Sequence, residues 1–194
     1  MGGTSHAGKS SLGKALATRL GWDLLSTDQF ARHPGRPWRN DETAVPSDVV
    51  DYFSNFDDLS LLNDVLSHYR DNIWPIVRAL VLSRVNNSFD ASVVIEGSAL
   101  LPDLVAEVAS EAVKPLWLLG DAPLIGRRIR EESSFSTRSQ TERNLIDTFA
   151  RRSVAFDTEL RLHLGKCAFP VVHASNAEPI SELLQRALAE MKIY

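Results

Sequence analysis

This sequence has little cysteine, no long apolar run and no excess of positive charge. Its single cysteine, Cys167, excludes an internal disulfide and a cysteine-based metal cluster, and it is typical of a reducing compartment. No apolar run approaches the roughly 20 residues that span a bilayer, and no signal peptide is visible. The formal net charge of −4 disfavours nucleic acid as the main partner. We therefore expect a cytoplasmic monomer or homodimer with neither a membrane nor a nucleic-acid partner.

The chain has the size and composition of one globular domain spanning residues 1–194, with 44% hydrophobic and 24% charged residues. Short apolar segments predict buried parallel strands, at 23–28, 92–96, 115–119 and 169–173. Helical patterns separate them, at 11–20, most of 47–85, 101–110, 122–132, 141–164 and 178–191. Such alternation predicts an α/β fold of three layers, α/β/α, with a mostly parallel sheet.

The most informative segment is Gly3–Ser10, which matches the phosphate-loop pattern G-x-x-x-x-G-K-[ST]. Backbone N–H groups of such a loop wrap phosphate oxygens, and the helix that follows presents its positive end to the same anion. Lys9 can reach the β- and γ-phosphates, and the Ser10 hydroxyl suits Mg²⁺. The motif predicts a site for ATP and Mg²⁺ whose nucleotide-binding residues are Gly3, Thr4, Ser5, His6, Ala7, Gly8, Lys9, Ser10 and Ser11.

Only Met1 and Gly2 precede this motif. A phosphate loop ordinarily follows a central buried strand, and loss of that strand would leave two neighbouring strand edges exposed. Either the first strand is very short or the native start lies upstream of Met1. We favour a truncated start and expect weakened stability and weakened nucleotide binding.

Two acidic residues close predicted strands. Asp28 ends the second strand and Glu96 the third, so both should lie at the carboxyl edge of the sheet, where ligands bind. Asp28 can orient or deprotonate an acceptor hydroxyl, or alternatively cap a following helix. Glu96 can organise Mg²⁺ and bind substrate, or alternatively be a buried structural acid. Gly97 would let a substrate approach the backbone closely.

The segment 33–87 is longer than a single connection between two parallel strands needs. We interpret it as a helical insertion over the cleft, in which Pro75 kinks or interrupts a helix. Arg32 and Arg36, just after Asp28, are candidate ligands for an anionic acceptor. His33 and Trp38 are interpreted as loop packing.

Residues 127–152 read as a helix–loop–helix lid rich in arginine. Its arginines could neutralise the transferring phosphoryl group, with Arg128 and Arg130 as catalytic candidates and Arg152 as a substrate ligand. Several of them must simply pair with nearby acids. Asn176, after the last strand, is a candidate for the adenine base, although a helix N-cap explains it equally well.

Taken together, these residues resemble the small-molecule and nucleoside-monophosphate kinases of the P-loop proteins. The start of the chain, Ile95-Glu96-Gly97 with Leu101-Pro102, and the pattern Phe149-x-x-Arg152 look most like the 2-phosphoglycerate kinase-like group. The resemblance implies a kinase that transfers the γ-phosphoryl group of ATP to a hydroxyl of a small, anionic metabolite. The alternatives are a catalytically weak, ATP-binding regulatory protein and a toxin-like kinase acting on an activated sugar.

Overall fold

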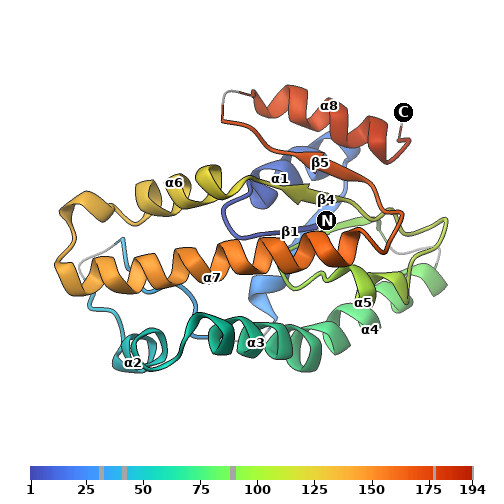
Figure 1. Cartoon of the computed structure of the whole chain (residues 1–194). Coiled ribbons are helices and arrows are strands. Elements are labelled where there is room, and N and C mark those ends of the chain that lie inside the picture. Colours follow the sequence, from blue (N-terminus) through green and yellow to red (C-terminus); the bar gives the residue numbers. More distant parts are fainter. Residues whose placement is uncertain (31–32, 41–42, 88–90, 177, 194) are drawn as a thin grey trace.

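The computed structural model of the protein describes residues 1–30, 33–40, 43–87, 91–176 and 178–193. Strands and helices alternate along most of the chain, so the α/β class predicted from the sequence is confirmed (Figure 1). The described strands are β1 (Gly2–Gly3), β2 (Asp23–Ser26), β3 (Val93–Glu96), β4 (Trp117–Leu119) and β5 (Val171–His173). The α-helices are α1 (Lys9–Leu20), α2 (Ser47–Asn55), α3 (Asp58–His68), α4 (Trp74–Asn86), α5 (Pro102–Ala106), α6 (Ala122–Glu132), α7 (Gln140–Leu164) and α8 (Ile180–Glu190).

The strands form one parallel arrangement that Met1 holds together. β1 pairs with β4 and β4 with β5, whereas β2 pairs with β3. The Met1 amine donates a hydrogen bond to the Ile95 carbonyl oxygen (2.6 Å), and the Gly97 N–H donates one to the Met1 carbonyl oxygen (3.2 Å). These two bonds have the pattern of a parallel pair. The order across the sheet is therefore β2-β3-β1-β4-β5, with the very short first strand at its centre.

The layers follow from alternation of side chains along the strands. In β4, Trp117 and Leu119 belong to an apolar cluster with α4, α5 and α7, whereas Leu118 belongs to a second cluster with α1 and α8. Figure 1 shows α1 and α8 on one side of the strands and α4, α5 and α7 on the other. The sheet is thus covered on both faces, as parallel sheets require.

The segment between β2 and β3 consists largely of helices α2, α3 and α4, with a π-helical turn at Tyr69–Ile73 joining α3 to α4. The sequence predicts that Pro75 kinks or interrupts a helix, and the regular α-helical pattern is indeed interrupted beside it, by the π-helical turn that runs directly into α4. A proline has no N–H to donate and its ring crowds the carbonyl group four residues earlier, so α-helical bonding cannot continue unchanged through this position.

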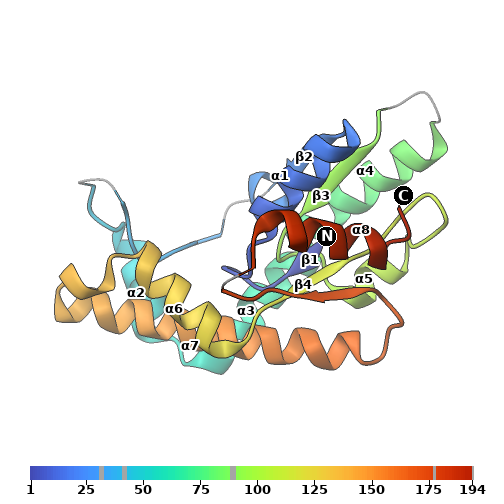
Figure 2. The ribbon, with the colours of Figure 1, turned by 90° about the horizontal axis from the view of Figure 1, so that it is seen from above.

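The arginine-rich segment is a helix–loop–helix as expected: α6, a short 3-10 turn at Phe135–Thr137, and α7. Asp121 caps α6 through the Leu124 N–H (2.7 Å), and a capping box of Ser139 and Glu142 begins α7. Seen from above, α2, α6 and the first half of α7 extend beyond the sheet (Figure 2). A third apolar cluster joins them and includes Trp38, Phe53, Ile125, Ile146 and Phe149.

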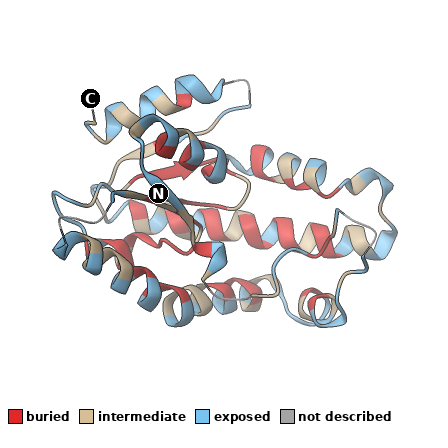
Figure 3. Ribbon diagram, turned by 180° about the vertical axis from the view of Figure 1, so that it is seen from behind, coloured by how far each residue is buried: buried red, intermediate tan, exposed pale blue. Residues whose placement is uncertain are grey.

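Buried residues recur along one face of α7 at three- and four-residue intervals, which is the helical period (Figure 3). Leu145, Phe149, Arg152, Phe156 and Leu160 all belong to this face. An arginine therefore occupies a buried position in an otherwise apolar series. None of the described helices is long and apolar enough to cross a membrane.

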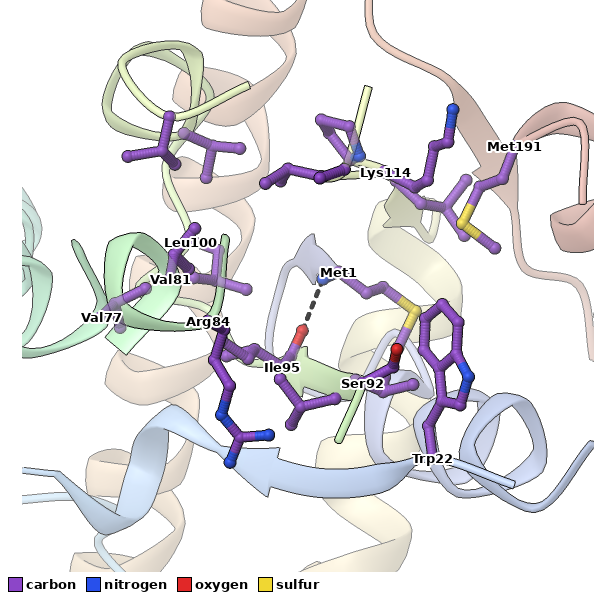
Figure 4. A pocket seen from close by; sticks show the side chains of 18 of the residues that line it. Met1, Trp22, Val77, Val81, Arg84, Ser92, Ile95, Leu100, Lys114 and Met191 are labelled. Carbon is purple, nitrogen blue, oxygen red and sulfur yellow. Dashed lines mark hydrogen bonds between the residues drawn. The ribbon is translucent and has the colours of Figure 1, made fainter. Parts of the chain in front are cut away.

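An apolar cavity of about 430 Å³ lies next to Met1, between β3 and β4 (Figure 4). Val93 and Ile95 line it from β3, Trp117 from β4, and Val77 and Val81 from α4. The Met1 amine is buried beside it, and this burial lowers its pKa from 8.0 to about 5, with Glu96 opposing the effect. The buried amine is therefore uncharged at neutral pH in the folded protein.

In a protein that begins at Met1, this amine makes stability depend on pH. In the unfolded chain the amine is protonated below about pH 8. In the folded protein it stays unprotonated until the pH falls to about 5. Stability should therefore fall as the pH falls, by about 1 kcal/mol between pH 8 and pH 7. Urea unfolding across this interval measures the slope, with retention of Met1 confirmed by intact mass.

Nα-acetylated protein is the control, since an amide at Met1 can still donate to Ile95 but does not titrate. The window avoids the histidines, whose unfolded pKa is near 6.5. Burial also lowers the pKa of Lys9 to about 8, which changes stability in the same direction but equally in the acetylated and unmodified proteins. Equal slopes in the acetylated and unmodified proteins would contradict the assignment.

Candidate active site

The phosphate-loop motif forms a tight turn between β1 and α1. Gly3 has φ +143°, and a Cβ there would lie 2.2 Å from the Leu118 carbonyl oxygen, so the position requires glycine. Gly8 adopts the left-handed conformation as the N-cap residue of α1. The first N–H groups of a helix have no partner within it. The turn places these donors of α1 beside the cavity that Gly8, Lys9 and Ser10 line.

The Lys9 ammonium is folded back on the loop. It is buried, and its Nζ donates a hydrogen bond to the Thr4 carbonyl oxygen (2.8 Å). Burial lowers the pKa of Lys9 to about 8, although the nearby carboxylates of Glu96 and Asp28 oppose the shift. A desolvated cation of this kind interacts strongly with an arriving polyphosphate.

Ser10 and Glu96 supply adjacent oxygen atoms, with the Ser10 hydroxyl donating to Glu96 Oε1 (3.3 Å). No cluster of three or more His, Cys, Asp or Glu side chains in the described ranges could hold a metal ion by itself. Mg²⁺ usually keeps several waters and combines one or two protein oxygens with substrate phosphates. The hydroxyl and carboxylate therefore fit a Mg²⁺ ion that arrives with a nucleotide.

Arg128 connects α6 to the phosphate loop. Its Nη1 donates hydrogen bonds to the carbonyl oxygens of His6 and Ala7, each at 3.0 Å. On the other side of the loop, the Thr4 hydroxyl donates to Asp157 Oδ1 of α7 (2.7 Å). Thr4 therefore anchors the loop to α7, because its hydroxyl is hydrogen-bonded to Asp157.

Asp28 lies in a 3-10 turn, Thr27–Gln29, directly after β2, and its side chain is exposed. The N-cap residue of this turn is Ser26, so the capping role that the sequence left open does not apply to Asp28. Gly97 has φ +156°, and a Cβ there would lie 1.8 Å from Thr27 Oγ1. The close approach that Gly97 permits is therefore to Thr27 of the protein itself.

One cavity of about 750 Å³ brings most of the sequence candidates together. Its walls come from the loop, from the ends of β2 and β3, from the segment between these strands, and from α6 and α7. The predicted residues that line it are Ser5, His6, Ala7, Gly8, Lys9, Ser10, Ser11, Asp28, Arg36, Glu96, Arg128 and Arg152.

The structure places other candidates elsewhere. Arg130, predicted to be catalytic, pairs with Asp147 (2.9 Å) and stacks over Phe135 (5.3 Å), because α6 turns this side chain away from the cavity. Ser175 and Glu178 line the cavity from the segment of Asn176, which does not itself line it. Asn176 is not an N-cap either, since Pro179 has that position in α8. Arg32 lies outside the described residues.

Several lining residues have no sequence motif to mark them. His33 was interpreted as loop packing, yet it lines the cavity together with His68 and Tyr69 of the insertion, and their rings lie close, with 4.9 Å between the His33 and His68 centroids. Trp38 does pack in the third cluster, as expected. Burial lowers the pKa of His33 to about 4 and that of His6 to about 3, assisted by neighbouring arginines, so both rings are neutral at pH 7.

No protein-family model matches this sequence, and neither does any curated protein sequence. Solved structures do resemble its fold. A gluconokinase from Sinorhizobium meliloti 1021 matches 98% of this chain and 89% of its own, with 18% identity and a TM-score of 0.51. A shikimate kinase from Bacteroides thetaiotaomicron matches 98% and 96%, with 14% identity and a TM-score of 0.53.

At these identities the similarity concerns the fold alone. The chain shares the fold of these two kinases over nearly its full length, which confirms, for the fold, the resemblance read from the sequence. The closer 2-phosphoglycerate kinase-like assignment stays a prediction.

Proposed function

We propose that this protein is an ATP-dependent kinase that transfers the γ-phosphoryl group to a hydroxyl of a small, anionic acceptor. The observation that supports this most directly is the single cavity shared by the loop, Asp28, Glu96 and Arg128. Donor-binding and acceptor-activating groups thus face one space, as direct transfer requires. The structural neighbours named above favour the same chemistry.

In this proposal the acceptor oxygen attacks the γ-phosphorus, and the bond from that phosphorus to the β–γ bridging oxygen breaks. The hydroxyl proton passes to the Asp28 carboxylate, and ADP leaves. The loop amides and Lys9 hold the donor, while Arg128 stabilises charge on the transferring group from the lid side. Phosphoryl transfer depends chiefly on such positioning and electrostatics.

Ser10 and Glu96 would hold Mg²⁺, which when bound neutralises phosphate charge. Glu96 is well suited because it is buried at the end of β3, so its position is determined by the sheet. Arg36 lines the cavity but forms an ion pair with Glu132 of α6. It would therefore bind an acceptor only by leaving that partner.

Asp28→Asn tests the acceptor side of this proposal. We expect kcat to fall by about 100- to 10,000-fold, the usual contribution of a general base, while the dissociation constant for ATP stays within a factor of a few. ADP release in the presence of Mg²⁺ and a panel of hydroxylated metabolites measures the first, and calorimetric titration of ATP measures the second.

Asp23→Asn is the matched control, because Asp23 is an exposed acid at the start of β2, the strand that Asp28 follows. Unchanged kcat in the Asp28→Asn variant would remove Asp28 from the mechanism. Binding of ATP without phosphoryl transfer to any acceptor would instead favour the regulatory alternative.

A further inference from the structure

The acceptor half of the cavity contains a buried cation with an unsatisfied donor. Arg152 is 8% exposed on the buried face of α7 and lines the cavity. Its Nη1 has no hydrogen-bond partner among the described residues. Leaving a buried donor unpaired is costly, so this atom indicates a missing ligand.

Aromatic rings hold the Arg152 guanidinium in place. It lies 4.6 Å from the centroid of Phe149 and 5.5 Å from that of Phe53. Such stacking fixes the plane of the guanidinium and so pre-organises its fork of donors. The Tyr52 hydroxyl interacts with the same guanidinium, but the nearby Asp64 carboxylate is engaged by Tyr52 (2.7 Å) and by His33 (3.2 Å). Arg152 is therefore positioned to bind an anion from the cavity.

The lysine and the other arginines that line the described part of the cavity are engaged elsewhere. Lys9 donates to Thr4 and Arg128 donates to the loop carbonyls, both on the donor side, and Arg36 pairs with Glu132. His33 is neutral at pH 7 because burial, aided by the charge of Arg152, lowers its pKa to about 4. The nearby Asp64 carboxylate offsets part of the Arg152 charge, so this end of the cavity favours an anion of low charge. A planar carboxylate carries one negative charge and matches the guanidinium fork, whereas a phosphate monoester carries nearly two.

The charges of Arg152 and Asp28 both act on the Tyr69 hydroxyl. Burial raises the pKa of this hydroxyl to about 12. All three side chains line the one cavity. An acceptor that contacts Arg152 can therefore extend toward Asp28.

We propose that the acceptor is a hydroxycarboxylate whose carboxylate binds Arg152 while its hydroxyl lies at Asp28, an assignment that rests on the proposed kinase function. It excludes a phosphate ester at this position. Arg152 is then the residue that determines acceptor specificity, distinct from the groups that hold ATP.

Matched compounds test this proposal without requiring that the physiological acceptor be known. Glycerate, glycerol and glycerol phosphate form one set, and gluconate, glucitol and glucose 6-phosphate form another. Thermal unfolding in the absence of ATP measures binding, and ADP release in the presence of ATP and Mg²⁺ measures transfer. We expect the carboxylates to raise the unfolding midpoint and to be the preferred acceptors within each set.

Arg152→Met should abolish that stabilisation and raise KM for the carboxylate by about 100-fold, the order expected for losing a buried charge-assisted contact. The dissociation constant for ATP should not change. Arg152→Lys keeps the charge but loses the fork, so an intermediate KM is expected. Arg151→Met is the matched control, because Arg151 is the exposed neighbour on α7 and pairs with Asp58 (2.8 Å).

The binding measurement and the transfer measurement together distinguish failure of this proposal from failure of the kinase function. Carboxylates that stabilise the protein through Arg152 without any ADP release would retain the subsite and overturn the kinase. Wild-type protein that binds the neutral or phosphate compounds as well as the carboxylates would overturn the subsite. Equal effects of the Arg152 and Arg151 variants, with both folded by circular dichroism, would also overturn it.

Discussion

Replacing Lys9 with Met is expected to lower kcat for phosphoryl transfer by about 100- to 1,000-fold, the range found when one charge-stabilising donor is removed from an active site. The physical reason is that Lys9 Nζ, now bonded to Thr4, is the cationic group of the loop that can turn to the transferring phosphoryl group. ADP release under saturating ATP and acceptor measures the loss.

The same variant should not be less stable than the wild type. Burial disfavours the charged form of Lys9, as its lowered pKa of about 8 indicates, and Met fills similar space without a charge. Lys14→Met on the exposed side of α1 is the control and should retain full activity. Full activity of the Lys9 variant would contradict the loop's assignment as the donor site.

Alanine substitution at two glycines should change stability in opposite directions. At Gly3 the backbone has φ +143° and the new Cβ would meet the Leu118 carbonyl oxygen at 2.2 Å. Backbone oxygen cannot move away without breaking the pairing of β1 with β4, so we expect Gly3→Ala to cost more than about 3 kcal/mol and to abolish nucleotide binding. Chemical unfolding and titration with ATP measure the two effects.

Gly126 is the matched position because it lies within α6, where a Cβ would have Arg130 Nη1 at 3.9 Å as its nearest neighbour. Alanine there reduces the conformational entropy of the unfolded chain, so Gly126→Ala should stabilise the protein by about 0.5–1 kcal/mol. If both alanines proved equally tolerated, β1 would not be held against β4 as described.

Local signals made much of this fold predictable. The helix expected at 122–132 has these bounds in the structure, because its cap, Asp121, and its first-turn proline act within a few residues. The predicted strands lie at the right places but are one or two residues too long at one end, because composition does not mark where the ladder hydrogen bonds stop. After β2, for example, the chain turns into a 3-10 helix at Thr27.

The arginines show where sequence reasoning stops. Arg128, Arg130 and Arg152 have equal chemistry and similar spacing, yet Arg128 contacts the loop, Arg130 pairs with Asp147, and Arg152 is buried. What separates them is which face of α6 or α7 packs against neighbouring helices. That face depends on residues far away in the chain, such as Phe53 of the insertion, which packs against Arg152.

By itself the sequence determined the phosphate loop, its lysine and its hydroxyl, because eight consecutive residues carry both the backbone turn and the donors. It likewise determined that acids end the strands at the carboxyl edge of a parallel sheet. The tertiary structure alone decided that Met1 joins the two halves of the sheet and that His33, Tyr69 and Arg152 share a cavity. These residues come from separate segments, and only the packing of the insertion against α7 brings them within reach of one ligand.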